Sequence, residues 1–257
     1  MPIVNRVLRA MRPEAQAFLA ERMTIRELVM GEILYRANHP FEHTIFPHRG
    51  IISVLAEQED GYSVEKVSIG EEGFTGFTAL LGGNMALGHA VVQIGGYASF
   101  IRIQDLDEAL NNFACVRKVL LLYSRALIGQ LMELVACNSL HSATQRVSRW
   151  LLHADERMEG SEFLLTQETL SHILGLRRAT VSTVCSQLLK SGAIRYSRGT
   201  ISVLDRQLLR SFSCQCHDRI VAINPPRIPN GKCEAAPAQC APRQNEPSGP
   251  LTNRPGS

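Results

Sequence analysis

The chain has 257 residues, of which 45% are hydrophobic, so it is long enough for one large domain or two small domains with real cores. Its formal net charge of +3 is small but unevenly distributed. Residues 1–138 carry 12 basic and 15 acidic side chains, whereas residues 139–217 carry 10 basic and 6 acidic ones. Within that second range, residues 177–210 carry seven basic side chains and one acidic side chain. Such a basic stretch indicates either a solvated face or a surface for polyanions.

The sequence has no pattern typical of a membrane or secreted protein. The apolar run at residues 119–123 is far short of the roughly 20 residues that cross a bilayer, and the N-terminus has no secretory hydrophobic region. The seven cysteines are odd in number and form no Cys-x-x-Cys pair, so a disulfide framework is not expected. We therefore expect a cytoplasmic protein without a membrane partner.

The first part of the chain has the composition and turn signals of short β-strands. Four segments combine β-branched and aromatic residues with alternating polarity: residues 23–35, 43–55, 63–69 and 90–103. Asp60-Gly61 is a hairpin turn signal, and Gly95-Gly96 divides the last segment into two shorter strands. Short strands with frequent turns predict a β-sandwich, jelly roll or barrel within residues 1–110, which begin with a short amphipathic helix.

Residues 111–138 predict one long helix, because they contain no proline and only one glycine, Gly129. Apolar side chains recur there at alternating spacings of four and three residues, as in a coiled-coil seam. Packing of the helix on its own domain is the alternative, but Gln130 at a seam position favours an interface between two subunits. The predicted homodimer seam consists of Val116, Leu120, Tyr123, Leu127, Gln130, Leu134 and Cys137.

Residues 164–204 have the pattern of a winged helix-turn-helix. Thr166 is placed to cap a first helix, and Gly175 supplies the backbone freedom to end it. A second helix is predicted over residues 178–190. Two short alternating runs within residues 194–203 then predict a β-hairpin, the wing.

A recognition helix of this kind fits the major groove and presents its N-terminal side chains to base edges. An arginine there can form two hydrogen bonds with one guanine, whereas serine and threonine reach phosphates or bases. A three-helix domain that binds proteins is the alternative, but the turn glycine, paired arginines and basic hairpin together favour DNA. The predicted DNA-contacting residues are Arg177, Arg178, Thr180, Ser182 and Thr183 on the helix and Arg195 and Arg198 on the wing.

Over residues 5–215 the sequence resembles the Crp/Fnr family, that of the cyclic-AMP receptor protein. Arg178, Thr180 and Val181 agree with the family's recognition-helix motif. The resemblance implies a dimeric transcription regulator with a cyclic-nucleotide-binding-type sensor domain, and a base-reading role for Arg178. Ala179 and Thr183 stand where the motif has an acidic residue and an arginine, so a different operator is expected.

The resemblance also implies an effector site in the sensor domain. Ile69-Gly70-Glu71 is similar to the start of the family's phosphate-binding cassette, but Leu87-Gly88-His89-Ala90 replaces the Arg-Ser pair of cyclic-AMP binders. A buried phosphate without an arginine would be unpaired. Gly70, Glu71 and His89 therefore form only a weak candidate pocket, and the effector is expected to be an unknown small molecule other than cyclic AMP, or none. No cysteine precedes Cys115, which disfavours the family's N-terminal iron–sulfur cluster, and no cofactor is expected.

Three histidines near Glu42 suggest an alternative function, a cupin-like metal-dependent enzyme with a winged-helix appendage. They are His39, His43 and His48. Cupins use a His-x-His pair followed by a glutamate, and this spacing is missing. We interpret the histidines as surface or turn residues and expect no enzyme activity.

Cys214, Cys216 and His217 could supply part of a zinc site, which requires four ligands. The fourth could be Cys233 or Cys240, but both lie in a C-terminal segment that we predict to be disordered. That segment, residues 218–257, holds eight of the twelve prolines and little periodic apolar pattern. We therefore interpret Cys214 and Cys216 as solvated thiols and expect no metal site.

The sequence thus predicts an α+β protein with four parts: a sensor domain (1–110), a connecting dimerisation helix (111–138), a DNA-binding domain (139–217) and a tail (218–257). Its predicted function is sequence-specific binding, as a homodimer, to an inverted-repeat operator on double-stranded DNA. Repression would require only occupancy of the operator, whereas activation would make RNA polymerase a further partner.

Overall fold

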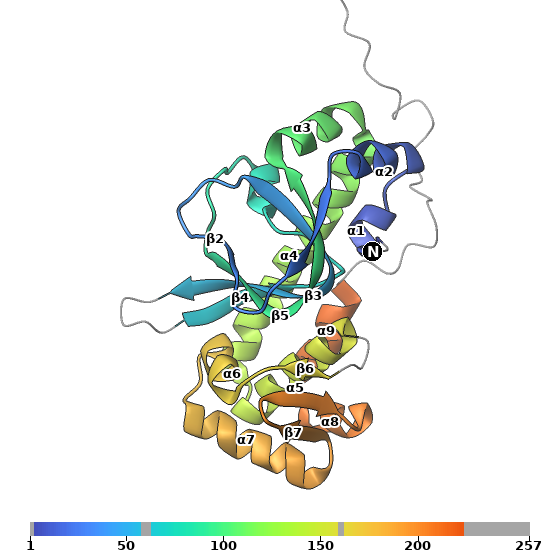
Figure 1. Ribbon diagram of the computed structural model, residues 1–257. Helices are drawn as coiled ribbons and strands as arrows, with labels where there is room; N and C mark the ends of the chain where they lie inside the picture. Colours follow the sequence, from blue (N-terminus) through green and yellow to red (C-terminus); the bar gives the residue numbers. More distant parts are fainter. Residues whose placement is uncertain (1–2, 58–62, 159–161, 224–257) are drawn as a thin grey trace, which may run out of the picture.

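A computed structural model describes residues 3–57, 63–158 and 162–223 of the chain. A sheet domain lies above a smaller helical domain, and the long helix α4 connects them (Figure 1). The predicted Asp60-Gly61 turn and most of the predicted tail lie outside the described residues. The helices are α1 (Arg6–Arg9), α2 (Pro13–Ala20), the 3-10 helix η1 (Phe77–Leu81), α3 (Ile103–Asn112), α4 (Ala114–Leu140), α5 (Ala143–Arg157), α6 (Gln167–Leu174), α7 (Arg178–Ser191), α8 (Arg206–Phe212) and α9 (Cys216–Ile223).

The sheet domain is built on two long antiparallel strands, β3 (His43–Glu57) and β5 (His89–Arg102). The hydrogen-bonded order is β1-β5-β3-β4, with β1 at Thr24–Leu28 and β4 at Ser63–Ile69, while β2 (Ile33–Tyr35) pairs with the start of β5. The predicted α+β class and sensor-domain fold are confirmed. The sheet is not the closed barrel that the sequence suggested, because β1 and β4, at the two ends of this order, do not pair with each other within the described residues.

Strand β5 is continuous, whereas the sequence predicted two strands divided at Gly95-Gly96. Gly96 pairs with Leu28 of β1, and a Cβ atom at Gly96 would lie only 2.1 Å from the carbonyl oxygen of Arg49. The glycine therefore allows β3 and β5 to approach closely and does not mark a turn.

One face of α4 packs into the core of the sheet domain. Val116 and Leu120 are fully buried there, in a cluster with Phe46, Phe74 and Ile101. The predicted dimer seam is this same face: Val116, Leu120, Tyr123, Leu127, Gln130 and Cys137 are all buried within their own chain, and Leu134 is partly buried. The seam prediction was wrong. The same spacing of apolar side chains arises when a helix face is buried within its own chain and when it is buried against a second helix.

The opposite face of α4 is apolar and exposed. Leu121, Ile128, Met132 and Val135 are 42%, 48%, 70% and 69% exposed and follow spacings of seven, four and three residues. Among the described helices, α4 is the one that is long and apolar enough to cross a membrane by length and composition alone. Its buried face belongs to the sheet-domain core, and its exposed face has no partner within the described residues.

The helical domain has its own core, formed by α5, α6, α7 and a small sheet of β6 (Phe163–Leu164), β7 (Ile194–Ser197) and β8 (Thr200–Val203). Helix α9 adds to this domain and packs on both α4 and α5. Residues 218–223 were predicted to be disordered, and this was wrong. Ile220 of α9 is buried, so this short helix is stabilised by tertiary contacts that composition does not reveal.

Candidate nucleic-acid interface

Helices α6 and α7 form the predicted helix-turn-helix. The Thr166 hydroxyl accepts a hydrogen bond from the backbone N–H of Thr169 at 3.0 Å, which caps α6 as predicted. Gly175 ends α6 with a φ of +58°, a conformation that other residues rarely adopt. The chain then turns directly into α7, and this turn fixes the direction in which α7 leaves the domain.

Helix α7 has one buried and one exposed face. Val181, Val184, Cys185 and Leu188 face the domain core, as the periodicity predicted for three of them. The predicted DNA-contacting residues lie on the other side: Arg177, Arg178 and Thr183 are exposed, and Thr180 and Ser182 are partly buried. Within the described residues no acidic side chain forms an ion pair with Arg177 or Arg178, so both guanidinium groups remain available to a polyanion.

The wing is a tight hairpin of β7 and β8. Arg198 and Gly199 occupy its two-residue turn with φ values of +51° and +79°, the geometry of a hairpin turn that matches the twist of the strands. Arg198 is exposed at the tip. Arg195 instead pairs with Glu162, whose pKa is held below its ordinary value by hydrogen bonds from Ser202 and Arg195.

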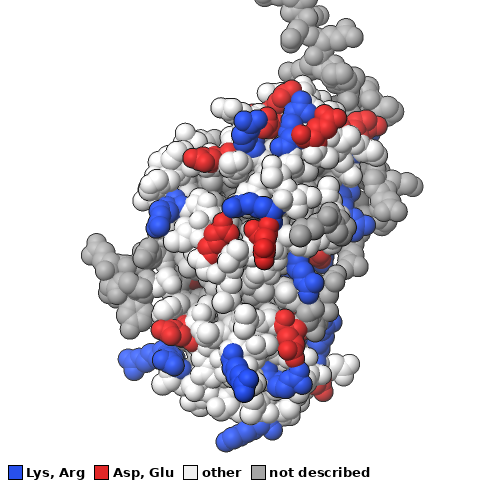
Figure 2. Space-filling view, in the orientation of Figure 1, with Lys and Arg blue, Asp and Glu red and all other residues white. Residues whose placement is uncertain are grey.

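Basic side chains gather at the lower end of the molecule (Figure 2), where Figure 1 places α7 and β7. The unpaired N–H groups of the first turn of α7 add to the attraction for anions, since no side chain caps that helix. The N-terminus of α7 and the wing therefore form a surface that is suited to a phosphate backbone and to base edges.

Comparison with known domain families assigns this region. The Crp-like helix-turn-helix domain family matches residues 145–212. The resemblance to Crp/Fnr proteins and the predicted helix-turn-helix are confirmed by this match.

Solved structures extend the likeness to the whole described fold. FixK2 from Bradyrhizobium japonicum superimposes with a TM-score of 0.62 at 19% identity, covering 75% of this chain and 98% of that one. The c-di-GMP-responsive global regulator CLP of Xanthomonas campestris superimposes with a TM-score of 0.61 at 13% identity, covering 75% of this chain and 99% of that one. TTHB099, a CRP-family transcriptional regulator from Thermus thermophilus, superimposes with a TM-score of 0.61 at 17% identity, covering 73% of this chain and 96% of that one. The chain therefore has the fold of the Crp/Fnr proteins. No curated protein sequence matches the chain.

Gly70, Glu71 and His89 line none of the three cavities that are described here. Glu71 is buried and accepts two hydrogen bonds from Arg6 of α1, at 2.8 and 2.6 Å. A Cβ atom at Gly70 would lie within 2.7 Å of the Arg157 side chain, and His89 begins β5. Gly70 and Glu71 are therefore in close contact with arginine side chains of their own chain.

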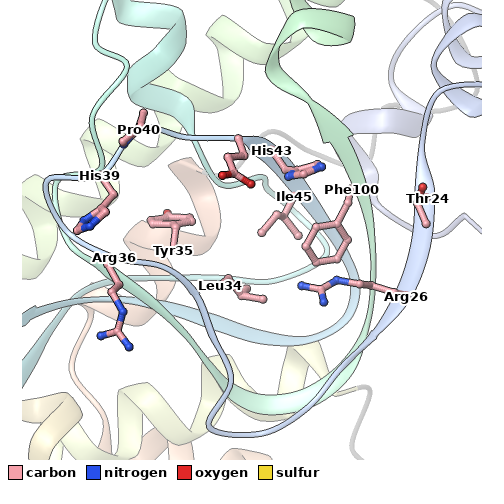
Figure 3. A pocket seen from close by; sticks show the side chains of 11 residues that line it. Thr24, Arg26, Leu34, Tyr35, Arg36, His39, Pro40, His43, Ile45 and Phe100 are labelled. Atoms are coloured by element: carbon pink, nitrogen blue, oxygen red, sulfur yellow. The ribbon is translucent and has the colours of Figure 1, made fainter.

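A cavity of about 560 Å³ lies elsewhere in the sheet domain, among β1, β2, β3, β5 and the loop after β2 (Figure 3). Its lining is rich in basic and aromatic groups: Arg26, Arg36, His39, His43, Tyr35 and Phe100, with Glu42 as the one acidic residue. The guanidinium of Arg26 stacks 4.1 Å from the centre of the Phe100 ring. Sequence reasoning missed this pocket because its walls come from four separate strands.

The three histidines of the enzyme alternative are not brought together. His39 and His43 line the cavity with Glu42, whereas His48 is buried away from it. The Nδ1 atom of His48 accepts hydrogen bonds from the backbone N–H groups of Val4 and Asn5, at 3.2 and 3.1 Å, and Nε2 lies 2.8 Å from the Ser99 hydroxyl. Burial lowers the pKa of His48 to about 4. His48 is therefore a neutral structural residue.

The interpretation of Cys214 and Cys216 as solvated thiols was wrong. Both are buried and pack with Cys137 of α4. His217 turns away from them, with Nε2 3.1 Å from Glu156 and Nδ1 3.1 Å from Asp218. Cys233 and Cys240 lie outside the described residues.

Proposed function

We propose that the protein is a sequence-specific DNA-binding transcription regulator that acts as a cytoplasmic homodimer without enzymatic activity. The observation that carries the proposal is the exposed N-terminus of α7, where Arg177 and Arg178 are free of acidic partners within the described residues and the wing tip Arg198 extends the basic surface. The Crp-like domain match supports it. The histidines on which the cupin-like alternative rested do not support it, since His48 lies apart from His39 and His43.

The dimer that we propose uses the exposed face of α4. Leu121, Ile128, Met132 and Val135 form an apolar stripe along the helix, and burying it against the same stripe of a second copy would remove these side chains from water. A two-fold axis along this face makes the interface self-complementary. This face replaces the seam first predicted from the sequence.

Two-fold symmetry sets the form of the operator. The two recognition helices would enter successive major grooves about 34 Å apart, so the site should be an inverted repeat. Arg178 would hydrogen-bond to a guanine, and the wing arginine Arg198 would contact the backbone. Ala179 and Thr183 lack the base-reading groups of the family motif, so the half-site should differ from that of the family prototype.

The cavity of about 560 Å³ is the place where we expect an effector, if the protein has one. Two arginines and two histidines line it with one acidic residue, and Arg26 is also paired with Glu32 outside the lining. Arg36, together with the aromatic rings, favours a small anionic molecule with a flat group. Because Glu71 is already paired with Arg6, and Leu87-Gly88-His89-Ala90 supplies no arginine for a phosphate, cyclic AMP in the mode of the family prototype is not proposed.

A direct test is selection of genomic DNA fragments by the purified full-length protein at moderate salt without effector. Enrichment of a two-fold symmetric motif is expected. Weak binding without sequence preference that fades steeply with salt would mean that an effector must first bind, and small anions would then be screened for restoring selection. Failure to bind any DNA at low salt would contradict the proposal and favour a protein-interaction module.

A further inference from the structure

Four metal-ligating side chains converge where the long helix meets the helical domain. Cys137 lies in the last turns of α4 and His141 at its C-terminal end. Cys214 lies between α8 and α9, and Cys216 is the first residue of α9. Their sulfur and nitrogen atoms all lie within 4.8 Å of one another. The three cysteines are buried and the histidine is partly buried. The sequence suggested Cys214 and Cys216 as ligands but did not reveal that Cys137 and His141 lie beside them.

The spacing fits one tetrahedral ion. With metal–sulfur and metal–nitrogen bonds of about 2.3 and 2.1 Å, neighbouring ligands of a zinc tetrahedron are separated by about 3.6–3.8 Å. Cys137 Sγ lies 3.6 Å from Cys214 Sγ, and Cys216 Sγ lies 3.6 Å from His141 Nδ1. An iron–sulfur cluster places its own iron and sulfide atoms between the ligands and requires wider separations.

The fold of the chain holds these ligands close to one another before any ion binds. Cys137 and His141 are four residues apart, so they lie one helical turn apart on the same side of α4. Helix α9 also packs closely on the middle of α4. A Cβ atom added to Gly129 of α4 would lie 3.0 Å from Ile223 Cγ2 of α9. A cavity of about 410 Å³, lined by His141, Cys214, Cys216 and Arg219 among others, gives an ion access from solvent.

We propose that Cys137, His141, Cys214 and Cys216 bind one thiophilic divalent metal ion in a tetrahedral Cys3His site, with zinc as the ion that fits best. On binding, the three thiols release their protons to solvent and the neutral imidazole keeps its other ring proton. Three thiolates and one imidazole are the donor set of closed, structural zinc sites.

The position of the site gives the ion a mechanical role. Helix α4 ends at Leu140 and α5 begins at Ala143, so the covalent connection between them is short. An ion that joins Cys137 and His141 to Cys214 and Cys216 adds a second connection across this hinge. The bound ion therefore fixes the angle between the long helix and the helix-turn-helix domain.

The test uses full-length protein that has been reduced and freed of metal, titrated with Co²⁺ and then with Zn²⁺. Saturation at one Co²⁺ per protomer is expected, with the intense visible bands of tetrahedral cobalt and a thiolate charge-transfer band, both removed by one equivalent of Zn²⁺. Zn²⁺ should also raise the melting temperature. Absence of saturable binding, or the weak spectrum of octahedral cobalt, would overturn the proposal.

Variants assign the ligands. Cys214→Ser and Cys216→Ser should each abolish the tetrahedral spectrum and weaken Zn²⁺ binding at least 100-fold, while helix content by circular dichroism stays unchanged. The control Cys185→Ser, which removes a buried thiol of α7 outside the cluster, should bind Co²⁺ as the parent does. The double variant Cys233→Ser/Cys240→Ser should also bind normally, and loss of binding there would overturn the ligand set.

Two other results would contradict a mononuclear site. Mass spectrometry of protein purified in air could reveal a Cys137–Cys214 disulfide in the absence of any bound metal, which would make the cluster a redox pair. Anaerobic treatment with iron and sulfide could give an iron–sulfur spectrum that depends on the same four residues. Either outcome would replace the zinc assignment with a different chemistry.

Discussion

At the scale of single residues, we propose that Arg178 of α7 reads a base whereas Arg198 of the wing contacts the DNA backbone. Replacement of Arg178 by alanine should weaken binding to the selected operator by about 1–3 kcal/mol and relax the preference at one base pair of each half-site. The reason is that a bidentate contact to guanine is lost. Titration of labelled operators with each base at that position would measure both effects.

Arg198 provides the matched control, because it is an exposed arginine of the same domain at the wing tip. Arg198→Ala should weaken binding to all sequences evenly and reduce the salt dependence, since a phosphate contact carries no base information. If Arg178→Ala leaves the base preference unchanged, the assignment of α7 as the reading helix is wrong.

His48 makes a second prediction at this scale. Its pKa is lowered to about 4 by burial, so the folded protein resists protonation of a residue that the unfolded chain protonates near pH 6.5. The stability that neutral His48 contributes is complete above pH 6.5 and is lost as the pH falls towards 4, which lowers the free energy of unfolding by about 3 kcal/mol. Urea titrations at several pH values would measure this slope.

The control for His48 is the variant His48→Gln, which can still accept from the backbone but does not titrate. Its unfolding free energy should fall less between pH 6.5 and pH 4 than that of the parent. Some slope should remain, because burial also lowers the pKa of His153 well below its ordinary value. Equal slopes in variant and parent would contradict the role assigned to His48.

At the scale of elements, α4 shows why a heptad pattern cannot by itself identify an interface. The helix carries two apolar faces, and the sheet domain covers the one whose spacing is more regular in the sequence. Intrachain burial and interchain burial impose the same chemistry on a helix face. Only the packing of the sheet domain decides which face remains for a partner.

The exposed face gives a prediction for this element. Ile128→Asp should convert the dimer to a monomer and weaken operator binding at least tenfold, since two charges would be buried at a self-complementary interface. Sedimentation and operator titration would measure both effects. Leu87→Asp, which alters a similarly exposed apolar side chain of the sheet domain, should leave the protein dimeric; a dimeric Ile128→Asp variant would rule out this face.

At the scale of the whole molecule, a buried polar network joins the two domains. Arg157 of α5 donates to Glu72 at 2.7 Å and to the hydroxyl and carbonyl oxygens of Ser68 at 2.8 and 3.1 Å. The Trp150 indole of the same helix donates to Glu65 at 3.1 Å. Burial raises the pKa of Glu65, whereas Arg157 outweighs the burial of Glu72 and holds its pKa below the ordinary value.

This network predicts a large effect of a single truncation. Arg157→Ala should destabilise the protein by about 3–5 kcal/mol, because the buried Glu72 carboxylate would lose its countercharge and keep only backbone hydrogen bonds such as that from Gly70. The double variant Glu72→Gln/Arg157→Met should lose less, since no charge remains unpaired. Urea unfolding would measure both, and equal losses would show that packing rather than charge dominates. The pKa of Glu72 is lower in the folded protein than in the unfolded chain. The stability that ionised Glu72 contributes is therefore fully present above about pH 4.3 and is lost as the pH falls through the folded pKa.

The same network, together with the contact of β4 on α6, connects the cavity-bearing sheet domain to the recognition helix. Gly175 lies in the turn that precedes α7. A Cβ atom added to Gly175 would lie 3.4 Å from the Val64 side chain of β4, so this strand packs directly against the turn. A change in the sheet domain therefore has a direct physical route to the DNA-binding surface. Such a route is what a shift between two helix arrangements would require.

The sequence by itself determined the helix-turn-helix, its wing and the long helix. Thr166, Gly175 and the buried stripe of α7 act on neighbours within a few residues, so their pattern is complete in the sequence. What only the tertiary structure decided depends on distant pairs: the free face of α4, the cavity walled by four strands, and the contact of Cys137 with Cys214, 77 residues away. Local spacing determines which side of a helix is apolar, whereas the packing of the whole chain determines what covers it.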